Sequence, residues 1–431
     1  MNDYQSTLDW LFHQLPMFSR VGAAAYKPGL DTSLRLDEHF GHPHRKFRSI
    51  HIAGTNGKGS CSHMLASILQ ASGYRTGLYT SPHLVDFRER IRINGEMIPQ
   101  ESVVDFITRF RTSTYDGKPS FFELTMMMAF DWFAQCHVDV AVIEVGMGGR
   151  LDSTNIITPE TSVITNISFD HTQFLGKTLP EIATEKAGII KSGIPVVVGE
   201  AEGDVKRVFT DHATKYGSSI HFVQENNDLK KITETPEGFK CESNTEGSFE
   251  CPLTGDYQKK NIATVLTTVK IMREVGFHIS PNAVKTGIAN VEHTTGLRGR
   301  WQKLFDHPLA ICDTGHNQAG LSYNLAKLKR LMDRRPEGKL RMVIGFVADK
   351  DIDSILQLFP KNAEYYLTNA DIPRALPVEE LAQICAATGL RGRTYQSVAE
   401  AWKSALSEAS DDDMIYVGGS TFVVADLLRD I

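Results

Sequence analysis

The chain has 431 residues, of which 41% are hydrophobic and 23% charged, and its net charge is −6. This length exceeds what one hydrophobic core usually organises, so two or three domains are expected. The composition is that of a soluble globular protein, and the acidic balance argues against a broad nucleic-acid-binding surface, although a local basic pocket for an anionic substrate is compatible with it.

The sequence shows neither a membrane-helix pattern nor an export-signal pattern. No run approaches the roughly 18 apolar residues of a membrane helix, so no membrane partner is expected, and the first 25 residues carry Asp3 and Asp9 and lack a basic-then-apolar leader. The cysteines are far apart and form no C-x-x-C pair, which indicates reduced thiols in a cytoplasm rather than disulfides or a zinc site. They are Cys61, Cys136, Cys241, Cys251, Cys312 and Cys385.

The N-terminal half alternates apolar strand candidates with segments of helical period. Strands separated by helices predict an α/β domain with a mainly parallel sheet, and the nearly continuous apolar runs are typical of strands covered on both faces. The strand candidates are 47–53, 138–146, 161–168 and 194–199, and the helix candidates between them include 60–73 and 179–193.

The pattern changes twice in the second half. Residues 200–255 are polar, turn-rich and weakly alternating, which predicts a small β excursion on the first domain, followed by a helix over about 259–275. The Gly-rich stretch 294–300 has the composition of a linker, and a second α/β pattern follows it. Its strand candidates are 309–315, 340–347, 363–369, 393–397 and 413–420, with a helix up to about Met332. We therefore predict a first domain over 1–296, a linker over 297–300 and a second, Rossmann-like α/β domain over 301–431.

The stretch HIAGTNGKGSCSH, residues 51–63, stands where a phosphate-binding loop would, between a strand and a helix. It lacks the early glycine of the usual pattern, and a glycine separates its lysine from the following serine. Its glycines allow close backbone approach to an anion, and the helix beginning near Ser60 adds its positive end. Lys58 can reach terminal phosphates, and Ser60 or Thr55 can offer a hydroxyl. The alternative is a glycine-rich turn without a ligand.

The stretch AVIEVGMGGRLDSTN, residues 141–155, places Glu144 at the end of an apolar run, where open α/β sheets bind ligands. A buried carboxylate needs a cation or strong hydrogen bonds. Mg²⁺ that bridges nucleotide phosphates would satisfy it. The alternative is a carboxylate that caps the next loop.

Three other stretches carry polar residues at strand or helix ends. Asp170 and His171 follow a strand candidate and could supply a metal ligand or a base, although a lone histidine is usually structural. Lys186, on the next helix candidate, is by default a solvated surface lysine. In CDTGHNQAG, residues 312–320, Asp313 ends a strand and His316 opens a helix, so a second strand-end site is predicted there. The alternative is an Asp or Asn that only caps the helix.

Taken in chain order, HIAGTNGKGS, YTSPHL, EVGMGGRLDSTN, SFDHTQFLG, EKAGIIK and DTGHN resemble the motifs of the Mur ligase superfamily, and within it those of folylpolyglutamate synthase and dihydrofolate synthase. The family's own loop is G-T-N-G-K-G-S, and residues 54–60 reproduce it. This accounts for the departure from the usual phosphate loop. The resemblance implies a P-loop ATPase domain followed by a glutamate-ligase α/β domain.

The resemblance also implies a reaction. A substrate carboxylate attacks the γ-phosphate of ATP and becomes an acyl phosphate, and the amino group of L-glutamate then displaces phosphate. The acceptor would be dihydropteroate, a folate that already carries glutamate, or both. ATP and Mg²⁺ at two positions are the implied cofactors, and a monomer is expected. Such phosphoryl transfer needs positioning and charge neutralisation more than covalent help from the protein.

Residue roles carry over from the resemblance, motif by motif. The nucleotide contacts are Gly54, Thr55, Asn56, Gly57, Lys58, Gly59, Ser60, Asn261, Arg300 and Asp313. The metal ligands are Ser60, Ser81, Glu144 and His171, and the catalytic residues are Lys58, Lys186, Asp313 and His316. Phe122, which would stack on the pterin ring, and Asp152 belong to the acceptor pocket. Lys186 matches a lysine that can be carbamylated in this family, which would turn a cation into a carboxylate-like ligand.

Two positions depart from the family pattern. Tyr257 precedes Gln258 where a histidine is frequent, and Gln318 follows Asn317 where a proline is usual. Neither change removes a phosphate or metal ligand. The alternatives are a related Mur-type ligase for a non-folate carboxylate and a nucleotide-dependent switch module. The loop favours folate ligases, because the wall ligases usually carry Thr or Ser directly after the lysine, and a switch would not need the second strand-end site.

Overall fold

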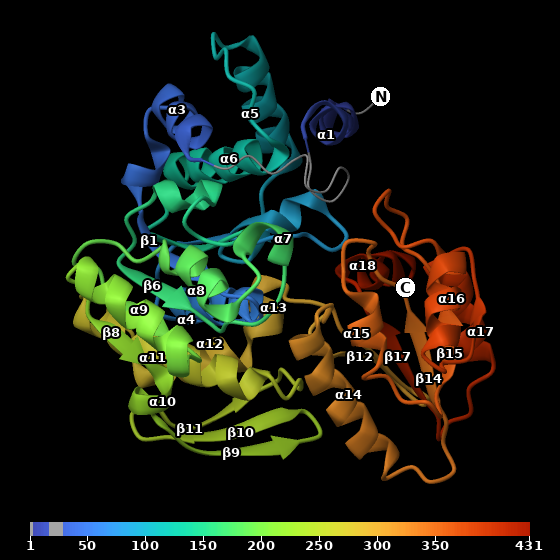
Figure 1. The fold of residues 1–431 in the computed structure, drawn as a ribbon. Coiled ribbons are helices and arrows are strands. Elements are labelled where there is room, and N and C mark those ends of the chain that lie inside the picture. Colours follow the sequence, from blue (N-terminus) through green and yellow to red (C-terminus); the bar gives the residue numbers. More distant parts are fainter. Residues whose placement is uncertain (1–2, 17–28) are drawn as a thin grey trace. The chain divides into compact units, whose positions relative to one another are not determined.

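A computed structural model of the chain describes residues 3–16 and 29–431 (Figure 1). Part of the first 25 residues, for which the sequence predicts no leader, lies outside the described residues. The chain divides into two compact units. The first consists of Met1–Pro252 and Gln258–Leu297, and the second of Leu253–Tyr257 and Arg298–Ile431. The five residues before α11 therefore belong with the second unit.

The first unit is built on an eight-stranded sheet in the order β4-β3-β2-β5-β1-β6-β7-β8. From β2 to β8 in this order all neighbours are parallel, and β3 and β4 add an antiparallel edge. The strands are β1 (Arg48–Ala53), β2 (Thr76–Tyr79), β3 (Ile91–Ile93), β4 (Glu96–Met97), β5 (Val140–Glu144), β6 (Thr161–Ile164), β7 (Val196–Val198) and β8 (Ile220–Phe222). The predicted α/β fold with a mainly parallel sheet is confirmed.

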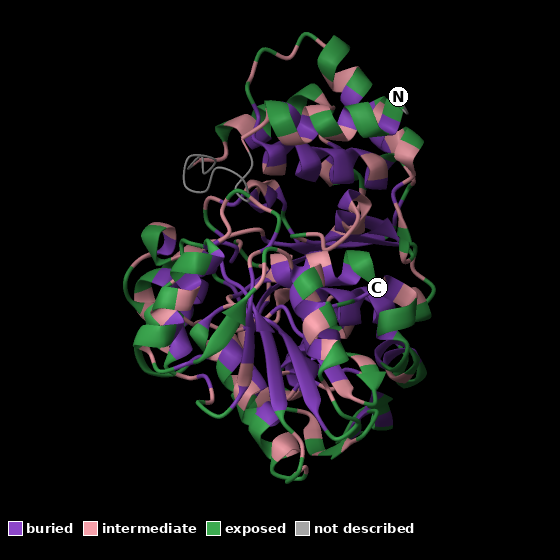
Figure 2. Cartoon of the chain, turned by 90° about the vertical axis from the view of Figure 1, so that its right-hand side faces the viewer, coloured by how far each residue is buried: buried purple, intermediate pink, exposed green. Residues whose placement is uncertain are grey.

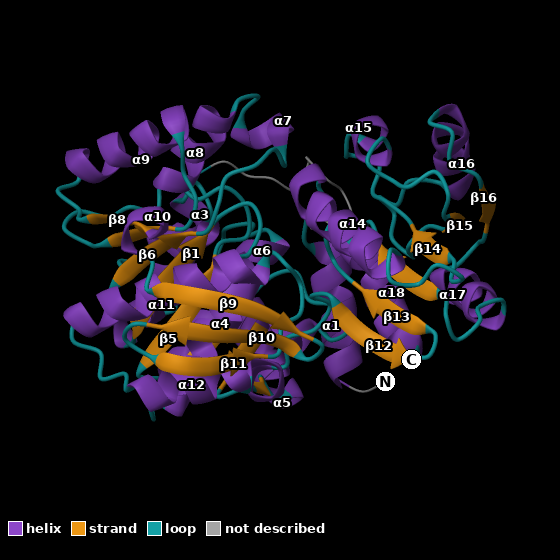
Figure 3. Cartoon of the chain, turned by 90° about the horizontal axis from the view of Figure 1, so that it is seen from below, coloured by secondary structure: helices purple, strands orange, loops and turns teal. Residues whose placement is uncertain are grey.

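Helices cover both faces of this sheet (Figure 3). One face packs on α4 (Lys58–Ala71) and α11 (Gln258–Glu274), and α12 (Pro281–Ala289) and α13 (Val291–Thr295) pack against α4. The other face packs on α6 (Phe121–Gln135), α8 (Leu179–Ala187) and α9 (Gly203–Lys215). Outside these lie α1 (Asp3–Gln14), α3 (Asp31–His39) and α5 (Gln100–Thr112), and shorter turns are α7 (Thr172–Leu175), α10 (Val223–Asn226), η2 (Pro43–Lys46), η3 (Phe87–Arg90) and η4 (Ser153–Ile156).

Burial follows this layering. The central strands β2, β5 and β6 are buried at every position, and Figure 2 shows exposed residues mainly on the outer sides of helices and in loops. Such double coverage explains why these strands read as continuous apolar runs. Within the described part of the chain, no helix has both the length and the apolar character needed to cross a membrane.

The helix predicted over 179–193 ends earlier, at Ala187. The backbone N–H of Arg150 donates to the Glu185 carbonyl at 2.7 Å, and the Asn155 side chain donates to the Gly188 carbonyl at 3.0 Å. These carbonyls would have accepted the next helical hydrogen bonds, so the neighbouring loop ends the helix. Ile189 and Ile190 then enter the core.

The predicted β excursion is a three-stranded antiparallel sheet in the order β11-β10-β9. Its strands are β9 (Leu229–Thr235), β10 (Gly238–Ser243) and β11 (Gly247–Cys251), and β11 packs on α12. The inward-facing Phe239, Cys241 and Phe249 are buried, while the alternate positions are exposed, as expected for a sheet with one solvated face.

The second unit has a six-stranded sheet in the order β12-β13-β17-β14-β15-β16. All neighbours are parallel except β12, an antiparallel edge strand that the sequence analysis missed. The strands are β12 (Gln302–Asp306), β13 (Leu309–Cys312), β14 (Leu340–Ile344), β15 (Glu364–Leu367), β16 (Gly392–Thr394) and β17 (Met414–Gly418). The helices are α14 (Gln318–Met332), α15 (Ile352–Leu356), α16 (Val378–Ala387), α17 (Val398–Ser407) and α18 (Thr421–Asp430).

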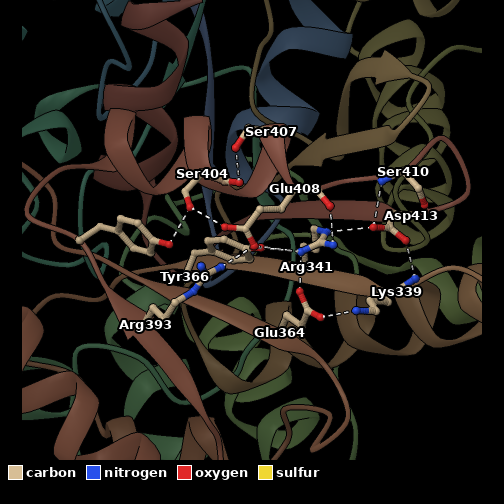
Figure 4. A network of polar contacts seen from close by, with 11 residues as sticks. Lys339, Arg341, Glu364, Tyr366, Arg393, Ser404, Ser407, Glu408, Ser410 and Asp413 are labelled. Carbon is tan, nitrogen blue, oxygen red and sulfur yellow. Dashed lines mark hydrogen bonds and ion pairs between the residues drawn. The ribbon is translucent and has the colours of Figure 1, made fainter.

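A buried arginine joins the amino ends of three strands in this unit (Figure 4). Arg341, on β14, donates to Asp413 beside β17 at 2.9 Å and to the Tyr366 hydroxyl at 2.6 Å. It also pairs with Glu364 on β15 and donates to the Glu408 carbonyl. A buried charge is costly unless it is paired and hydrogen-bonded, and these contacts satisfy the guanidinium. The network thereby links the amino ends of β14, β15 and β17.

Candidate active site

The phosphate loop occupies residues 54–57, between β1 and α4. Gly54 and Gly57 have positive φ angles of 147° and 86°, which glycine adopts readily and other residues avoid. The helix begins at Lys58, two residues before the expected start near Ser60, because Gly57 serves as its N-cap in the left-handed conformation. The backbone N–H groups of the first helical turn therefore face the loop, an arrangement that suits an anion.

Lys58 folds back over this loop. Its ammonium group donates to the carbonyl of Gly54 at 3.1 Å and to that of Thr55 at 3.2 Å. An ammonium has three N–H donors, so this placement leaves one for a phosphate oxygen. The side chain thus adds a positive charge where the loop amides and the helix end already favour negative charge.

The end of β6 holds the loop in shape. The Asn166 side chain accepts from the Asn56 N–H at 2.9 Å, and the Thr165 hydroxyl donates to the Asn56 carbonyl at 2.6 Å. Thr55 and Ser168 exchange hydrogen bonds through the Thr55 hydroxyl, each at 3.1 Å. Thr165, Asn166 and Ser168 are not among the residues predicted from the sequence. The polar cluster directly after the strand was the available signal.

Asn261 reaches the loop from α11. A Cβ atom on Gly57 would lie 2.3 Å from Asn261 Oδ1, so the carboxamide fits only against glycine. Asn261 Nδ2 donates to Gln258 Oε1 at 2.8 Å, and Gln258 Nε2 donates to the Ser60 hydroxyl at 3.1 Å. Gln258, which has no assigned role, is fully buried and couples Asn261 to Ser60.

Glu144 and Ser81 meet beside the loop. Glu144 ends β5, next to Ile52 of β1, and its side chain is buried. Its Oε2 accepts the Ser81 backbone N–H at 3.1 Å, and Ser81 follows the neighbouring strand β2. The Glu144 carboxylate and the Ser81 hydroxyl would offer oxygen donors, and oxygen ligands are what Mg²⁺ prefers. These residues therefore fit such a metal.

His171 lies at the same edge of the sheet, past the end of β6. It adopts a left-handed backbone conformation (φ 49°) as the N-cap of α7, and its N–H donates to Asp170 Oδ1 at 2.9 Å. Its ring is 28% exposed, whereas the Asp170 side chain is 7% exposed. Because the carboxyl ends of adjacent parallel strands share one edge, the order β2-β5-β1-β6 brings Ser81, Glu144, the loop and His171 to that edge.

Lys186 is buried, so the interpretation as a solvated surface lysine is wrong. Its ammonium donates to the Gly54 carbonyl at 3.0 Å, the same oxygen that Lys58 contacts. Burial, reinforced by the charge of Lys58, lowers the pKa of Lys186 to about 7, although Asp170 and Asp152 act in the opposite direction. A lysine with such a pKa is partly a neutral amine near neutrality.

Phe122, on α6, and Asp152, in the loop after β5, both lie beside Gly146. A Cβ atom on Gly146 would come within 2.5 Å of the Phe122 ring and 3.2 Å of Asp152 Oδ2, so glycine is required between them. Asp152 accepts the N–H groups of Met147 at 2.9 Å and Thr154 at 3.0 Å, and it caps η4. Burial raises the pKa of Asp152. Its carboxylate thus shapes the loop in the structure.

The second unit has its own strand-end cluster around Asp313, which follows β13. One carboxylate oxygen accepts the Tyr257 hydroxyl at 2.6 Å and the Trp301 N–H at 2.7 Å. The other accepts the Gly315 N–H at 2.7 Å and the Asn324 side chain at 2.6 Å. Tyr257, one of the departures from the family pattern, is thus a direct partner of Asp313.

Arg300 and His316 both contact Thr314. The Arg300 guanidinium donates to the Thr314 hydroxyl, and His316 Nδ1 donates to the Thr314 carbonyl at 3.0 Å. The capping predicted as an alternative for this stretch belongs to Asn317, whose side chain accepts the Gly320 N–H at 2.9 Å. Gln318, at the second departure, is the first residue of α14.

Two family models match the chain. The Mur ligase middle domain matches residues 52–269, and the Mur ligase glutamate ligase domain matches residues 299–421. The first match includes the loop at 54–57, and the second includes Asp313. They define the class of the protein as a Mur-type ligase.

Individual relatives narrow this class. The chain is 33% identical to the folylpolyglutamate synthase of Lacticaseibacillus casei over 96% of each chain. The structure of Escherichia coli FolC in complex with DHPP and ADP has a TM-score of 0.84 and 30% identity, covering 99% of this chain and 97% of that one. A bifunctional folylpolyglutamate synthase/dihydrofolate synthase with Mn, AMPPNP and L-glutamate has a TM-score of 0.81 and 29% identity, covering 99% and 97%. The chain belongs to the folylpolyglutamate and dihydrofolate synthases of the Mur ligase family.

Proposed function

We propose that this chain is an ATP-dependent ligase that joins L-glutamate to the carboxylate of dihydropteroate, of a folate that already carries glutamate, or of both. The reaction passes through an acyl phosphate and releases ADP and phosphate. The observation that carries the proposal is the loop at 54–57, with the Lys58 ammonium folded over it and the buried Glu144 beside it. The relatives, whose names and ligands are those of folate ligases, support the acceptor class.

The loop would bind and orient the ATP phosphates. Loop N–H groups and the start of α4 face the β- and γ-phosphates, and Lys58 neutralises charge that develops on the γ-phosphate during transfer. The remaining nucleotide contacts in the proposal come from Thr55, Asn56, Gly59, Asn261, Arg300 and Asp313. Asn261 would also hold Gly57 in its conformation, since its side chain packs directly on that residue.

Ser60, Ser81, Glu144 and His171 would hold the divalent ions, with His171 at the second position. A bound Mg²⁺ would neutralise phosphate charge and fix the phosphate geometry. Oxygen donors dominate this set, as Mg²⁺ requires. The burial of Glu144 favours the assignment, because a buried carboxylate gains most from a nearby cation.

On the acceptor side, Phe122 would stack on the pterin ring and Asp152 would shape the pocket wall. His316 and Asp313 complete the catalytic set in the proposal. Since four donors already fix the Asp313 carboxylate, it would contact the nucleotide in a fixed orientation and also hold its neighbours in place.

Lys186 would act as a carbamate. A neutral amine attacks CO₂ and releases one proton, giving a carboxylate-like group beside the Gly54 carbonyl. The pKa of about 7 supports this, because a neutral amine is required. Protein treated with ¹³C-bicarbonate should give a carbamate signal in ¹³C NMR that is missing in Lys186→Met. An unmodified Lys186 in fully active enzyme would refute the carbamate.

The substrate assignment is tested by phosphate release with ATP, Mg²⁺ and L-glutamate plus either dihydropteroate or a monoglutamyl folate. We expect release only when a pterin acceptor and glutamate are both present, and mass spectrometry should show the acceptor extended by glutamate. Release with a non-folate carboxylate alone would indicate a different Mur-type ligase. Slow hydrolysis that ignores every acceptor would indicate a nucleotide switch.

The proposal also places a monomeric enzyme in the cytoplasm. The reduced state of the cysteines fits this location, because all six are free thiols. Light scattering of the purified chain tests the monomer, and fractionation of the source cells tests the compartment.

A further inference from the structure

A second group of metal-ligating side chains lies where α3 leads into η2. Asp37, His42 and His44 come from one short stretch of chain, LDEHFGHPH. His42 Nδ1 donates to one oxygen of the Asp37 carboxylate at 2.6 Å, and His44 Nδ1 donates to the other at 2.5 Å. One ligand atom from each residue can be chosen so that all three lie within 4.8 Å of one another.

The three side chains form a site that is buried at Asp37 and open to solvent at His42. The Asp37 side chain is 2% exposed, that of His44 13% and that of His42 38%. The carboxylate is therefore covered almost completely, and the ring of His42 is the part of the site most exposed to solvent. His42 has a left-handed backbone (φ 53°), and its N–H donates to the Asp37 carbonyl at 2.7 Å. This turn directs the His42 ring back to Asp37.

The donor chemistry selects a class of ion. Two imidazole nitrogens and one carboxylate oxygen suit Zn²⁺ and similar transition-metal ions, whereas Mg²⁺ prefers oxygen alone. A neutral imidazole can move its proton from Nδ1 to Nε2, so each Nδ1 can become a ligand without a change in ring charge. Ligands about 2.0–2.2 Å from Zn²⁺ stand roughly 3.3 Å apart in a tetrahedron, so each Nδ1 would move away from its carboxylate oxygen to admit the ion.

We propose that Asp37, His42 and His44 bind one divalent transition-metal ion of the Zn²⁺ class. Three protein ligands leave the fourth position to water, on the exposed side of His42. The ion would fasten the end of α3 to η2, which packs on α6 and leads directly into β1 and the phosphate loop. This proposal does not depend on the ligase assignment.

The test titrates the full chain with Co²⁺, whose visible absorption reports nitrogen ligands in a site of low coordination number. The protein is first stripped with a chelator and kept in excess Mg²⁺. We expect one equivalent of Co²⁺ to give the absorption bands and Zn²⁺ to displace it. His42→Asn and His44→Gln should each weaken Co²⁺ binding at least about tenfold. Asparagine tolerates the positive φ of position 42, so the first variant keeps the backbone conformation.

Two histidine variants serve as matched controls. His39 is exposed in the same stretch, so His39→Ala should leave the bands unchanged, and His171→Ala, which alters the candidate active site, should also leave them unchanged. A melting temperature raised by Zn²⁺ in the native chain but not in His42→Asn would agree with the proposal. No bands in the native chain, undiminished binding in both ligand variants, or loss of the bands in His171→Ala would overturn it.

Discussion

Two lysines donate to one carbonyl oxygen in this protein. Lys58 and Lys186 both contact the Gly54 carbonyl, at 3.1 Å and 3.0 Å. Lys186 is buried, and its burial, reinforced by the nearby charge of Lys58, lowers the pKa of Lys186. The site thus holds, beside Lys58, a second amine whose pKa lies near neutrality.

Replacing Lys58 tests the role of the ammonium group over the loop. Lys58→Ala should lower glutamate-dependent phosphate release by at least about 10²-fold, because the charge over the loop is lost. The melting temperature should stay nearly unchanged, since the side chain bonds only two loop carbonyls. Lys231→Ala, at an exposed position of β9, is the control. Retained activity in Lys58→Ala would remove the loop lysine from the mechanism.

The pKa of Lys186 predicts a pH dependence of stability. It is lowered from 10.5 to about 7 in the folded chain, so between these values the unfolded chain binds a proton that the folded chain does not. The contribution of Lys186 to stability therefore rises with pH above 7 and is lost as pH falls toward 7. Urea unfolding in CO₂-free buffer measures the free energy of unfolding of the native chain and of Lys186→Met. The native value minus the variant value should increase with pH. A difference that is flat from pH 7 upward would refute the shift.

Part of this site was predictable from residue types in their order. Lys58 was singled out by the glycine-rich loop between a strand and a helix. Glu144 was singled out because it ends an apolar run, and His171 because it follows a strand candidate. The burial of Lys186 could not be predicted from the sequence, because its helix mixes polar and apolar residues. Only the packing of α8 decides which side of the helix is covered. Asn166 and Gln258, which hold residues of the loop and of α4 in place, were not predicted for a related reason. They act through contacts with residues that are distant in sequence.

At the scale of elements, α4 is the helix on which the site depends. It is buried from Ser60 to Leu69, and it carries Lys58 at its start. A glycine with positive φ stands at each end of it. Gly57 (φ 86°) precedes the helix and Gly73 (φ 88°) follows it. Their surroundings differ, because a Cβ on Gly57 would meet Asn261 at 2.3 Å, whereas a Cβ on Gly73 would meet nothing within 4 Å.

This pair gives a matched test of the loop geometry. Gly57→Ala and Gly73→Ala should each cost about 1 kcal/mol of stability from backbone strain. Only Gly57→Ala displaces Asn261, so it alone should lower phosphate release, by about 10²-fold. Thermal melts and the phosphate assay measure the two effects separately. Equal activity in the two variants would show that the contact with Asn261 is not needed.

Long, strongly patterned elements were predicted well, and several short strands were not. The helix expected over 259–275 is α11, and the buried strands β1, β5 and β6 lie within their predicted runs. No strand was predicted at β2, β3, β4 or β12. These strands have between two and five residues, so they show neither a long continuous apolar run nor a long alternation.

At the scale of the whole molecule, the two units have separate cores. The second unit has a hydrophobic cluster of its own and the buried Arg341 network at one edge of its sheet. Removing one partner of a buried ion pair leaves the other without compensation. The side chains of Arg341 and Asp413 are 5% and 4% exposed, so this pair should matter for the stability of its unit.

Arg341→Met should therefore destabilise the second unit by about 3 kcal/mol. Hydrogen exchange should accelerate in β14, β15 and β17, while β1 and β5 of the first unit keep their protection. Lys339→Met removes a neighbouring cation that is 63% exposed and pairs with Glu364, and it should cost under about 1 kcal/mol. Equal effects of the two variants, or faster exchange throughout the first unit, would contradict separate cores.

The central claim is that the acceptor carboxylate takes the γ-phosphoryl group of ATP before glutamate attacks. The most direct measurement uses an acceptor whose reactive carboxylate carries ¹⁸O, with ATP, Mg²⁺ and L-glutamate, and follows the label by mass spectrometry of the released phosphate. An acyl phosphate transfers one carboxylate oxygen to phosphate, so the account predicts labelled phosphate in step with product. Unlabelled phosphate alongside glutamylated product would contradict it.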